Sequence, residues 1–385
     1  IQILFLFSIY LAIHAYINIQ DNLKISSIFY FRYILFLISI NYILENLELN
    51  KKHNLKNIFY LIVIILFIIF FDTIYQYLTG KNFLGYEITT NRISSFFGSE
   101  YILGSFLLKF FPVFLWFIYY FELDLKKHSK LIITIFAGFF ISIYLSGERT
   151  SFGLLLISLI CFVLLIQNLR KIIYISFSIF LLFISTTLYT GIGKSDLLNR
   201  IFIKTFNQMT SQVFTQKQEK ETEITVKEKS QKIIKNFKIF SEDHHGHYKL
   251  AYNLFLDEPI FGTGPRGFRY YCRNIDYDPD IGICSTHPHN IILQFLSEIG
   301  LVGFSFYLFV IFYVILKAFR ISYISNKNSE IYCFLIASIG IIVYLFPFLP
   351  SGNFFNNWIS ISNYYLIALY FYSYKKVFNK NDYNF

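Results

Sequence analysis

The chain has 385 residues, of which 55% are apolar types and 15% are charged, and its mean hydropathy is +0.50. A soluble domain carries about 25% charged residues, so this chain lacks the polar surface that water requires. The composition therefore excludes a chain built of soluble domains, a disordered chain and a scaffold held by many disulfides. It indicates a protein that crosses a membrane several times. In such a protein the net charge of +10 reflects sidedness, and we expect no nucleic acid as a partner.

Apolar runs suited to membrane-spanning helices recur along the chain. A helix needs about 20 mostly apolar residues to cross a bilayer, and lipid offers no hydrogen-bond partner to an open backbone. The sequence therefore predicts an all-α transmembrane bundle of about ten spans. In chain order the predicted spans are 1–20, 26–44, 57–72, 101–121, 130–146, 151–167, 172–190, 295–317, 331–348 and 356–374. Because the chain begins inside an apolar run, we expect a further segment before it.

Basic residues in the short connections predict which helix ends face the cytoplasm, where Lys and Arg accumulate. One alternate set of connections holds fourteen Lys and Arg residues, from Lys51 to Lys380. The other set holds four, namely Lys24, Lys81, Arg92 and Arg149. The first set and the C-terminus are therefore predicted to be cytoplasmic, and the long connection after residue 190 is predicted to face outward.

This long connection divides the chain into three predicted parts. Residues 1–190 hold seven transmembrane helices, residues 191–289 form one large outward (periplasmic) loop, and residues 290–385 hold the last three helices and the cytoplasmic C-terminus. Within the loop, apolar residues from 247 to 255 recur at helical spacing, so we expect a helix there.

Four stretches of the sequence carry motifs that belong together. They are TNRISSFFGSEYILGSFLLKFFP at 90–112, SGERTSFGLLL at 146–156, DEPIFGTGPRGFRYYC at 257–272 and CSTHPHNIILQFLSEIGLVGF at 284–304. In this order they resemble the O-antigen ligase/polymerase family of bacterial membrane glycosyltransferases. The signature of that family is a Gly-rich turn followed by HPHN and by a helix rich in Leu and Gly.

The resemblance implies an enzyme that transfers a glycan from an undecaprenyl diphosphate carrier to a sugar hydroxyl, without a metal or other cofactor. The reaction would take place at the periplasmic face of the bacterial inner membrane, among membrane lipids. The acceptor would be a growing glycan in a polymerase, the lipid A core in a ligase or a protein in a third variant, and the sequence leaves this choice open. The alternative function is a transporter or flippase of lipid-linked sugars, although the internal repeat typical of transporters is not visible.

His289 is the predicted catalytic base in this interpretation. The ordinary pKa of an imidazole, near 6.5, suits it to accept the proton of an acceptor hydroxyl. His289 directly precedes the point where a helix re-enters the membrane, so its backbone is anchored while its ring can face the interface. The alternative is a surface histidine in a Pro-containing turn. His287 and Asn290 are predicted to contact the substrate beside it.

Three arginines are predicted to bind the departing diphosphate, because guanidinium stays charged and grips phosphate oxygens in pairs. Arg149 follows Glu148 at the tip of an outward hairpin. A positive residue is unusual there, because Lys and Arg prefer the cytoplasmic side. The alternative is an arginine that reaches to the interface and is satisfied by Glu148 or by lipid phosphate. Arg92, in a second outward connection, and Arg266, on the Gly-rich turn, could converge on the same anion.

The Gly-rich turn GTGPRG also matches the dinucleotide fingerprint G-x-G-x-x-G. No βαβ unit surrounds it, and its predicted position lies outside the cytoplasm, so we set this interpretation aside. Two others remain: a turn whose N–H groups approach an anion, with Arg266 beside them, or an ordinary turn after a helix.

Two cysteines of the outward loop, Cys272 and Cys284, enclose eleven residues just before THPHN. In an oxidising periplasm they are predicted to form a disulfide, which would hold the segment that leads to His289. The alternative is a zinc site that also uses His287 and His289, an arrangement more typical of a cytosolic protein.

Overall fold

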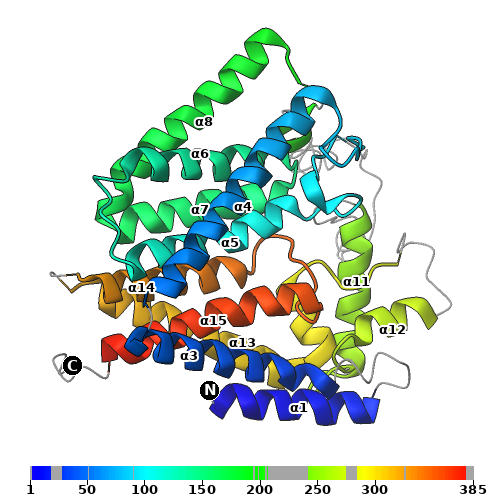
Figure 1. Ribbon diagram of the computed structural model, residues 1–385. Helices are drawn as coiled ribbons and strands as arrows, with labels where there is room; N and C mark the ends of the chain where they lie inside the picture. The colour runs from blue at the N-terminus through cyan, green and yellow to red at the C-terminus, as the bar shows by residue number, and fades with distance from the viewer. Residues whose placement is uncertain are drawn as a thin grey trace, which may run out of the picture. The chain divides into compact units, whose positions relative to one another are not determined.

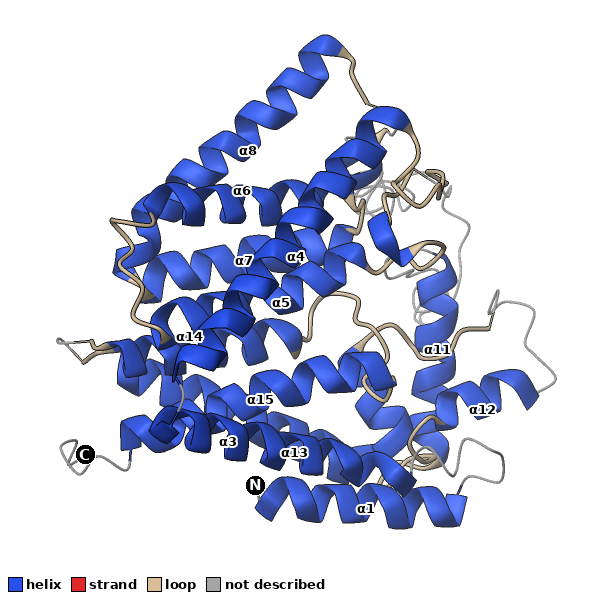
Figure 2. Cartoon of the chain, viewed as in Figure 1, coloured by secondary structure: helices blue, strands red, loops and turns tan. Residues whose placement is uncertain are grey.

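The computed structural model describes residues 2–18, 28–50, 52–89, 91–193, 196–197, 199–203, 206, 242–274, 284–324 and 327–378. Within these ranges every regular element is a helix, and extended pairing is limited to two isolated bridges, Lys81 with Glu87 and Thr89 with Arg92 (Figure 2). Much of the first half of the predicted outward loop lies outside the described residues. The predicted all-α class is confirmed.

Each predicted apolar range falls on a helix (Figure 1). The helix predicted near residues 247–255 is also present, as α11. The elements are α1 (Gln2–Asn18), η1 (Phe29–Phe31), α3 (Arg32–Asn50), α4 (Lys52–Thr79), η2 (Ser95–Phe97), α5 (Leu103–Tyr120), α6 (Ser129–Leu145), α7 (Arg149–Leu165), η3 (Gln167–Leu169), α8 (Arg170–Thr190), η4 (Asn199–Ile203), α11 (Glu242–Asp257), α12 (Gly267–Asn274), α13 (Ile291–Ser322), α14 (Ser329–Tyr344) and α15 (Asn357–Phe378).

Length and apolarity divide these helices into groups. Within the described part of the chain, four segments are long and apolar enough to cross a membrane: Lys56–Thr79, Leu103–Tyr120, Gln167–Thr190 and Ile291–Ser322. Four further helices, α1, α6, α7 and α14, are apolar but no longer than 17 residues. The structure therefore supports a membrane protein, while the count of ten spans and the outward placement of 191–289 stay predictions.

The described helices form two compact units, each of which collects segments far apart in the sequence. The histidine unit consists of Ile1–Phe31, Leu198–Leu308 and Pro347–Ile359. The arginine unit consists of Arg32–Leu197, Phe309–Phe346 and Ser360–Phe385. We name each unit after the predicted site residue that it contains, His289 or Arg149. The three-part division predicted from the spans follows the order of the chain, whereas these units follow packing.

The core of the arginine unit is aromatic. Helix α5 is apolar on nearly every side and is almost wholly buried, as expected for a helix with neighbours all round. The ring of Phe111 in α5 lies 5.0 Å from that of Phe139 in α6 and 5.8 Å from that of Phe162 in α7. Helix α14 packs closely on α5. Gly340 lies at this contact, where a Cβ atom would come within 3.1 Å of Pro112.

The core of the histidine unit includes a break in α13. Gly300 has φ +61° and ψ −164°, which interrupts the helix. In an unbroken helix the carbonyls of Ser297 and Glu298 would accept from N–H groups four residues later. Here the Ser297 carbonyl accepts from the N–H of Thr263 at 2.9 Å, and the Glu298 carbonyl accepts from that of Gly264 at 2.8 Å. The N–H groups of the Gly-rich turn thus replace the helical N–H donors that these two carbonyls lose at the break.

The same turn also receives the N–H groups that lose their partners at the break. The N–H of Leu301 donates to the carbonyl of Pro259 at 2.9 Å, and that of Val302 donates to the carbonyl of Ile260 at 3.2 Å. All four main-chain groups are therefore paired one for one, as burial in an apolar helix requires. The approach is so close that a Cβ atom at Gly300 would lie 2.3 Å from the oxygen of Ile260.

Candidate active site

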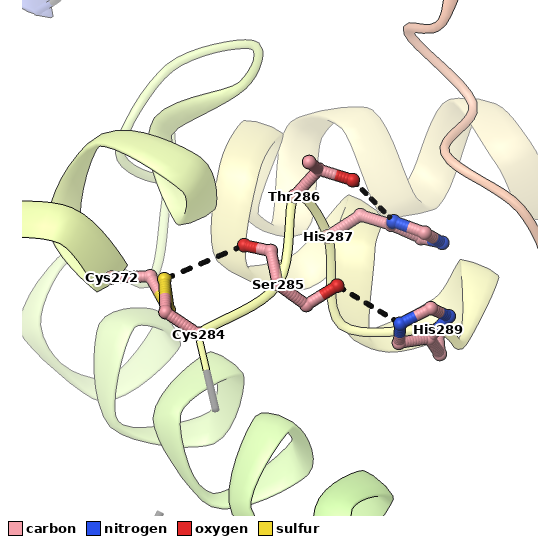
Figure 3. Close-up of a disulfide and its surroundings, with 6 residues drawn as sticks. All are labelled: Cys272, Cys284, Ser285, Thr286, His287 and His289. Carbon is pink, nitrogen blue, oxygen red and sulfur yellow. Dashed lines mark hydrogen bonds between the residues drawn. A yellow bond between two sulfur atoms is a disulfide. The ribbon is translucent and has the colours of Figure 1, made fainter. Parts of the chain in front are cut away.

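The segment 284–290, which carries THPHN, is held at both ends. At its start, Cys284 forms a disulfide with Cys272 of α12 (Figure 3). Cys272 is 3% exposed and belongs to an apolar cluster with Leu254 and Phe268. At its end the segment continues directly into α13. Six residues, 285–290, therefore lie between the disulfide and the start of α13.

His289 lies in the turn before α13 and adopts φ +57°, a left-handed conformation that few residues other than glycine adopt. Its ring Nε2 lies 2.9 Å from the hydroxyl oxygen of Ser285 (Figure 3). Its carbonyl accepts a hydrogen bond from the N–H of Ser351 at 2.9 Å. The residue is partly exposed. A neutral imidazole nitrogen that faces a hydroxyl can take its proton, which is the contact that a general base needs.

Asn290 begins α13. Its Oδ1 accepts from the N–H of Leu293 at 3.1 Å, as an N-cap side chain does. Its Nδ2 donates to the carbonyl of Pro347 at 3.1 Å. The oxygen and the nitrogen of the side-chain amide are thus both hydrogen-bonded within the protein. In the structure Asn290 caps α13 and joins it to Pro347. Its contact with the substrate stays a prediction.

His287 is 8% exposed and uses both ring nitrogens. Its Nε2 lies 3.0 Å from the carbonyl oxygen of Ser351, and its Nδ1 lies 3.0 Å from the hydroxyl of Thr286. A carbonyl can only accept, so Nε2 carries the proton and Nδ1 accepts from the hydroxyl. The His287 ring lies 4.1 Å from that of His289 between centroids. His287 is therefore a fixed neighbour of His289, and its direct contact with the substrate stays a prediction.

A third histidine, His247 of α11, lies close to the ring of His289. The ring of His247 lies 5.4 Å from that of His289 and 6.3 Å from that of Phe268, and the residue is 5% exposed. Sequence reasoning missed it because His247 is more than 40 residues away along the chain and stands beside two other histidines. The signal was its helical spacing to the buried residues Ala251 and Leu254.

Arg266 lies on the Gly-rich turn with φ +69°. Its Nη2 donates to the carbonyl of Phe355 at 2.7 Å and lies 3.5 Å from Oδ1 of Asn357. The N–H groups of Thr263 and Gly264 donate to carbonyls of α13, and the N–H of Phe268 donates to the carboxylate of Glu298 at 3.3 Å. The turn is therefore a tertiary contact with α13, and the binding of the diphosphate by Arg266 stays a prediction.

In the arginine unit, Glu148 connects the starts of two helices. It precedes α7, whose first residue is Arg149. Its carboxylate oxygens accept from the N–H of Gly104 at 2.8 Å and from that of Ser105 at 3.1 Å, both in the first turn of α5. Nη2 of Arg92 lies 3.9 Å from the same carboxylate. One largely buried carboxylate therefore satisfies N–H groups at the start of α5 and brings Arg92 beside the hairpin.

Arg92 belongs to a connection between α4 and α5 that buried polar groups fix. Asp72 of α4 is 0% exposed and accepts from the hydroxyl of Ser95 at 2.5 Å. Gln76, also in α4, accepts from the N–H of Ser95 at 2.7 Å. Nη2 of Arg92 donates to the carbonyl of Tyr101 at 2.8 Å, and its guanidinium lies 4.7 Å from the centre of that ring. These contacts therefore hold the side chain of Arg92 in one position.

The charges around the hairpin are not balanced. The carboxylate of Glu148 lies beside Arg92, and a second guanidinium group, that of Arg149, lies close enough to Arg92 to act on its charge. Burial lowers the pKa of Arg92, Glu148 opposes that shift, and the like charge of Arg149 adds to it. Burial also raises the pKa of Glu148, against the effect of Arg92 and of the hydrogen bonds to the carboxylate. Because arginine stays charged, the start of α7 is a positive place that suits an anion.

A metal centre has little support in this arrangement. Among the described residues, no group of three or more His, Cys, Asp and Glu side chains is arranged to hold a metal ion. The sulfur atoms of Cys272 and Cys284, which the zinc interpretation needs as ligands, are bonded to each other.

Comparison with known proteins identifies one relationship. The model of a family described as O-antigen ligase matches residues 134–308. No curated protein and no solved structure matches the chain. The matched range contains the hairpin with Arg149, the turn with Arg266 and the segment with His289, while Arg92 precedes it.

Proposed function

We propose that this chain, which belongs to the O-antigen ligase family through residues 134–308, transfers a glycan from a polyprenyl diphosphate carrier to a hydroxyl group of an acceptor. The observation that carries the proposal is that one family match covers both the hairpin with Arg149 and the segment with His289. Family membership implies glycan transfer of the O-antigen ligase type. The finer parts of the proposal are the undecaprenyl carrier and a reaction at the periplasmic face of the inner membrane.

His289 serves as the base in this proposal. The acceptor oxygen attacks the anomeric carbon of the glycan, the bond from that carbon to the diphosphate breaks, and the acceptor proton passes to the imidazole. Support comes from the hydrogen bond between Nε2 and the Ser285 hydroxyl, which shows that an O–H group fits against this nitrogen. A base that takes the proton in the transition state contributes about 10²–10⁴-fold to the rate.

Arg149 and Arg92 hold the diphosphate, whose charge increases as the bond to the glycan breaks. Support comes from the start of α7, where Arg149 acts on the charge of Arg92 and where Arg92 lies beside the carboxylate of Glu148. A fixed cation placed where negative charge develops lowers the barrier because it needs no reorientation during the reaction. His287, Asn290 and Arg266 contact other parts of the protein, and their main role in the proposal is to fix the segment 284–290.

The alternative, a transporter or flippase of lipid-linked sugars, gains no support from the break in α13. Transporters use the main-chain groups of broken helices to bind cargo near the middle of the membrane. In this chain the groups at the break pair with the turn at 259–264. A flux assay in vesicles that lack acceptor glycan separates the two functions, because a transferase moves no sugar there.

The test is glycan transfer by purified variants in lipid nanodiscs, with a polyprenyl-diphosphate-linked glycan and an acceptor lipid. We expect His289→Ala to lower kcat by about 10³-fold and Arg149→Ala by about 10²-fold with a raised KM for the donor. His128→Ala and Arg320→Ala remove the same groups elsewhere and should keep wild-type rates. Wild-type transfer by His289→Ala or by Arg149→Ala would overturn the role assigned to that residue.

A further inference from the structure

The loop that joins α14 to α15 runs against the segment 284–290 within the histidine unit. We call residues 347–356 of this loop the brace. The main chain of Ser351 makes two contacts: its N–H donates to the carbonyl of His289 at 2.9 Å, and its carbonyl lies 3.0 Å from Nε2 of His287. One residue of the brace thus holds both histidines of the motif.

The brace is tied to the interior by a buried amide in α13. Gln294 is 0% exposed; its Nε2 lies 2.8 Å from Oδ1 of Asn353 and 3.0 Å from Oε2 of Glu298. Its Oε1 accepts from the N–H of Phe354 at 3.0 Å. Asn353 in turn donates from Nδ2 to the carbonyl of Thr286 at 3.4 Å. A continuous chain of hydrogen bonds therefore leads from the core of α13 through the brace to the THPHN segment.

Both ends of the brace are also held. At its start the carbonyl of Pro347 accepts from Asn290, and near its end the carbonyl of Phe355 accepts from Arg266 at 2.7 Å. The ring of Phe355 lies 5.6 Å from that of Tyr30, and these two rings meet edge to face. The arrangement leaves the brace little freedom to move apart from the segment that it holds.

We propose that the brace positions His289 for catalysis and that Gln294, Asn353 and Arg266 act on the reaction through it. This inference rests on the proposed function, in which His289 is the base. A histidine in the left-handed region persists only where its surroundings determine it, and here the Ser351 N–H does so directly. A displacement of about 1 Å at a reacting group can cost about 10²-fold in rate. These three are positioning residues, since none of them has to touch the substrate.

The chain offers a matched set of variants for the test. Asn353→Ala removes every contact of this half-buried side chain, while Asn353→Asp keeps the oxygen that accepts from Gln294 and Phe355. Gln294→Leu keeps the size of the buried hub and removes all of its hydrogen bonds. Asn356→Ala is the control, because Asn356 belongs to the same loop, is exposed, and its side chain accepts from the N–H of Trp358 at the start of α15.

The measurement is kcat and the donor KM for each variant, with hydrogen exchange of peptides that cover 284–290. We expect Asn353→Ala to lower kcat about tenfold and Gln294→Leu about 10²-fold, with the donor KM unchanged and exchange of the segment faster. Asn353→Asp keeps the contacts with Gln294 and Phe355 but cannot donate to Thr286, so its kcat should lie between those of Asn353→Ala and wild type. Asn356→Ala should change neither readout.

Two results separate the inference from its premise. Wild-type kcat in both Asn353→Ala and Gln294→Leu, together with an inactive His289→Ala, would overturn the role of the brace and leave the proposed function intact. An active His289→Ala would overturn the proposed function itself. Because Asn353 is only half-buried, its variants keep the test decisive even if Gln294→Leu fails to fold.

Discussion

The arginine unit and the histidine unit hold their reactive side chains by different chemistry. In the arginine unit, buried carboxylates do this: Asp72 fixes the connection that carries Arg92, and Glu148 joins Arg92 to the start of α5. In the histidine unit, His289 has hydrogen bonds with a hydroxyl and a main-chain N–H, and the buried carboxyl of Glu298 lies one step further away, against the amide of Gln294.

This difference matches the chemistry that each unit needs. A guanidinium stays charged beside a carboxylate, so ionised supports do not impair a diphosphate site. A carboxylate beside an imidazole would favour the protonated ring, which cannot accept a proton. Neutral hydrogen-bond partners in direct contact with the ring therefore suit a base, and the two units should lose function under different treatments.

The largest expected effect is in the histidine unit, at the break in α13. In Gly300→Ala the new Cβ would clash with the carbonyl of Ile260, and φ +61° with ψ −164° is accessible only to glycine. We expect a loss of about 4–5 kcal/mol in the free energy of unfolding of that unit. Thermal unfolding in detergent, with exchange resolved by peptide, measures this.

Gly303→Ala is the comparison on the same helix: its Cβ would meet the side chain of Ile299 and no main-chain atom, and its φ and ψ are helical, so we expect a smaller loss. Equal stability of the two variants would contradict the account of the break.

The next effect is in the arginine unit. Glu148→Ala leaves Arg92 and the N–H groups of Gly104 and Ser105 without their carboxylate. Removing one partner from such a buried set costs about 3–4 kcal/mol, and donor binding should weaken as well. Unfolding and donor binding by calorimetry measure both effects, and Glu148→Gln, which keeps one acceptor oxygen, should be milder. An Ala variant that matched wild type in both would argue against the carboxylate as a support.

The pH dependence sharpens this comparison. Burial raises the pKa of Glu148 in the folded state above its ordinary value near 4.3 in the unfolded chain. The folded state therefore binds more protons between the two values, and stability falls as the pH rises through this window. Relative to Glu148→Gln, the wild type should lose stability as the pH rises from about 4.3 through the raised pKa. A difference that grew in the opposite direction would contradict the sign of the shift.

The disulfide gives an effect of about 3 kcal/mol that is confined to the histidine unit. Joining Cys272 to Cys284 restricts the unfolded chain, and reduction removes that restriction. We expect a reductant to destabilise the histidine unit and to slow transfer in the wild type. Transfer by a Cys272→Ala, Cys284→Ala double variant should already be slow and should not respond.

The other two cysteines provide the control. Cys161 and Cys333 are free thiols, and changing both to Ala should leave the response to the reductant intact. A wild-type enzyme with the same rate before and after complete reduction would show that the disulfide does not support the site.

The smallest expected effect is at Ser285. Its hydroxyl occupies Nε2 of His289, where the acceptor hydroxyl has to bind. Removing a hydrogen bond of about 1 kcal/mol should lower the acceptor KM about fivefold in Ser285→Ala. Thr286→Ala, whose hydroxyl meets His287 instead, should not do so. An acceptor KM that rose in Ser285→Ala would mean that Ser285 helps to bind the acceptor.

The sequence allowed much of the fold and part of the site to be predicted. Apolar runs placed the helices because a long hydrophobic stretch has few other solutions in lipid. The hairpin with Arg149 and the segment with His289 were found from local motifs. The pairing of Ser351 with His289 joins residues more than 60 positions apart through main-chain atoms, so no side-chain pattern announces it. His247 and Gln294 were missed for another reason: each stands in a helix whose pattern indicates burial but not which distant side chain it meets.

The most direct test of the central claim, that the imidazole of His289 takes the acceptor proton, is chemical rescue. His289→Ala should be inactive in glycan transfer, and free imidazole in the buffer should restore the rate in proportion to its concentration. Arg149→Ala should not respond to imidazole, because it lacks a cation for the diphosphate. Transfer by His289→Ala at the wild-type rate without imidazole would contradict the account.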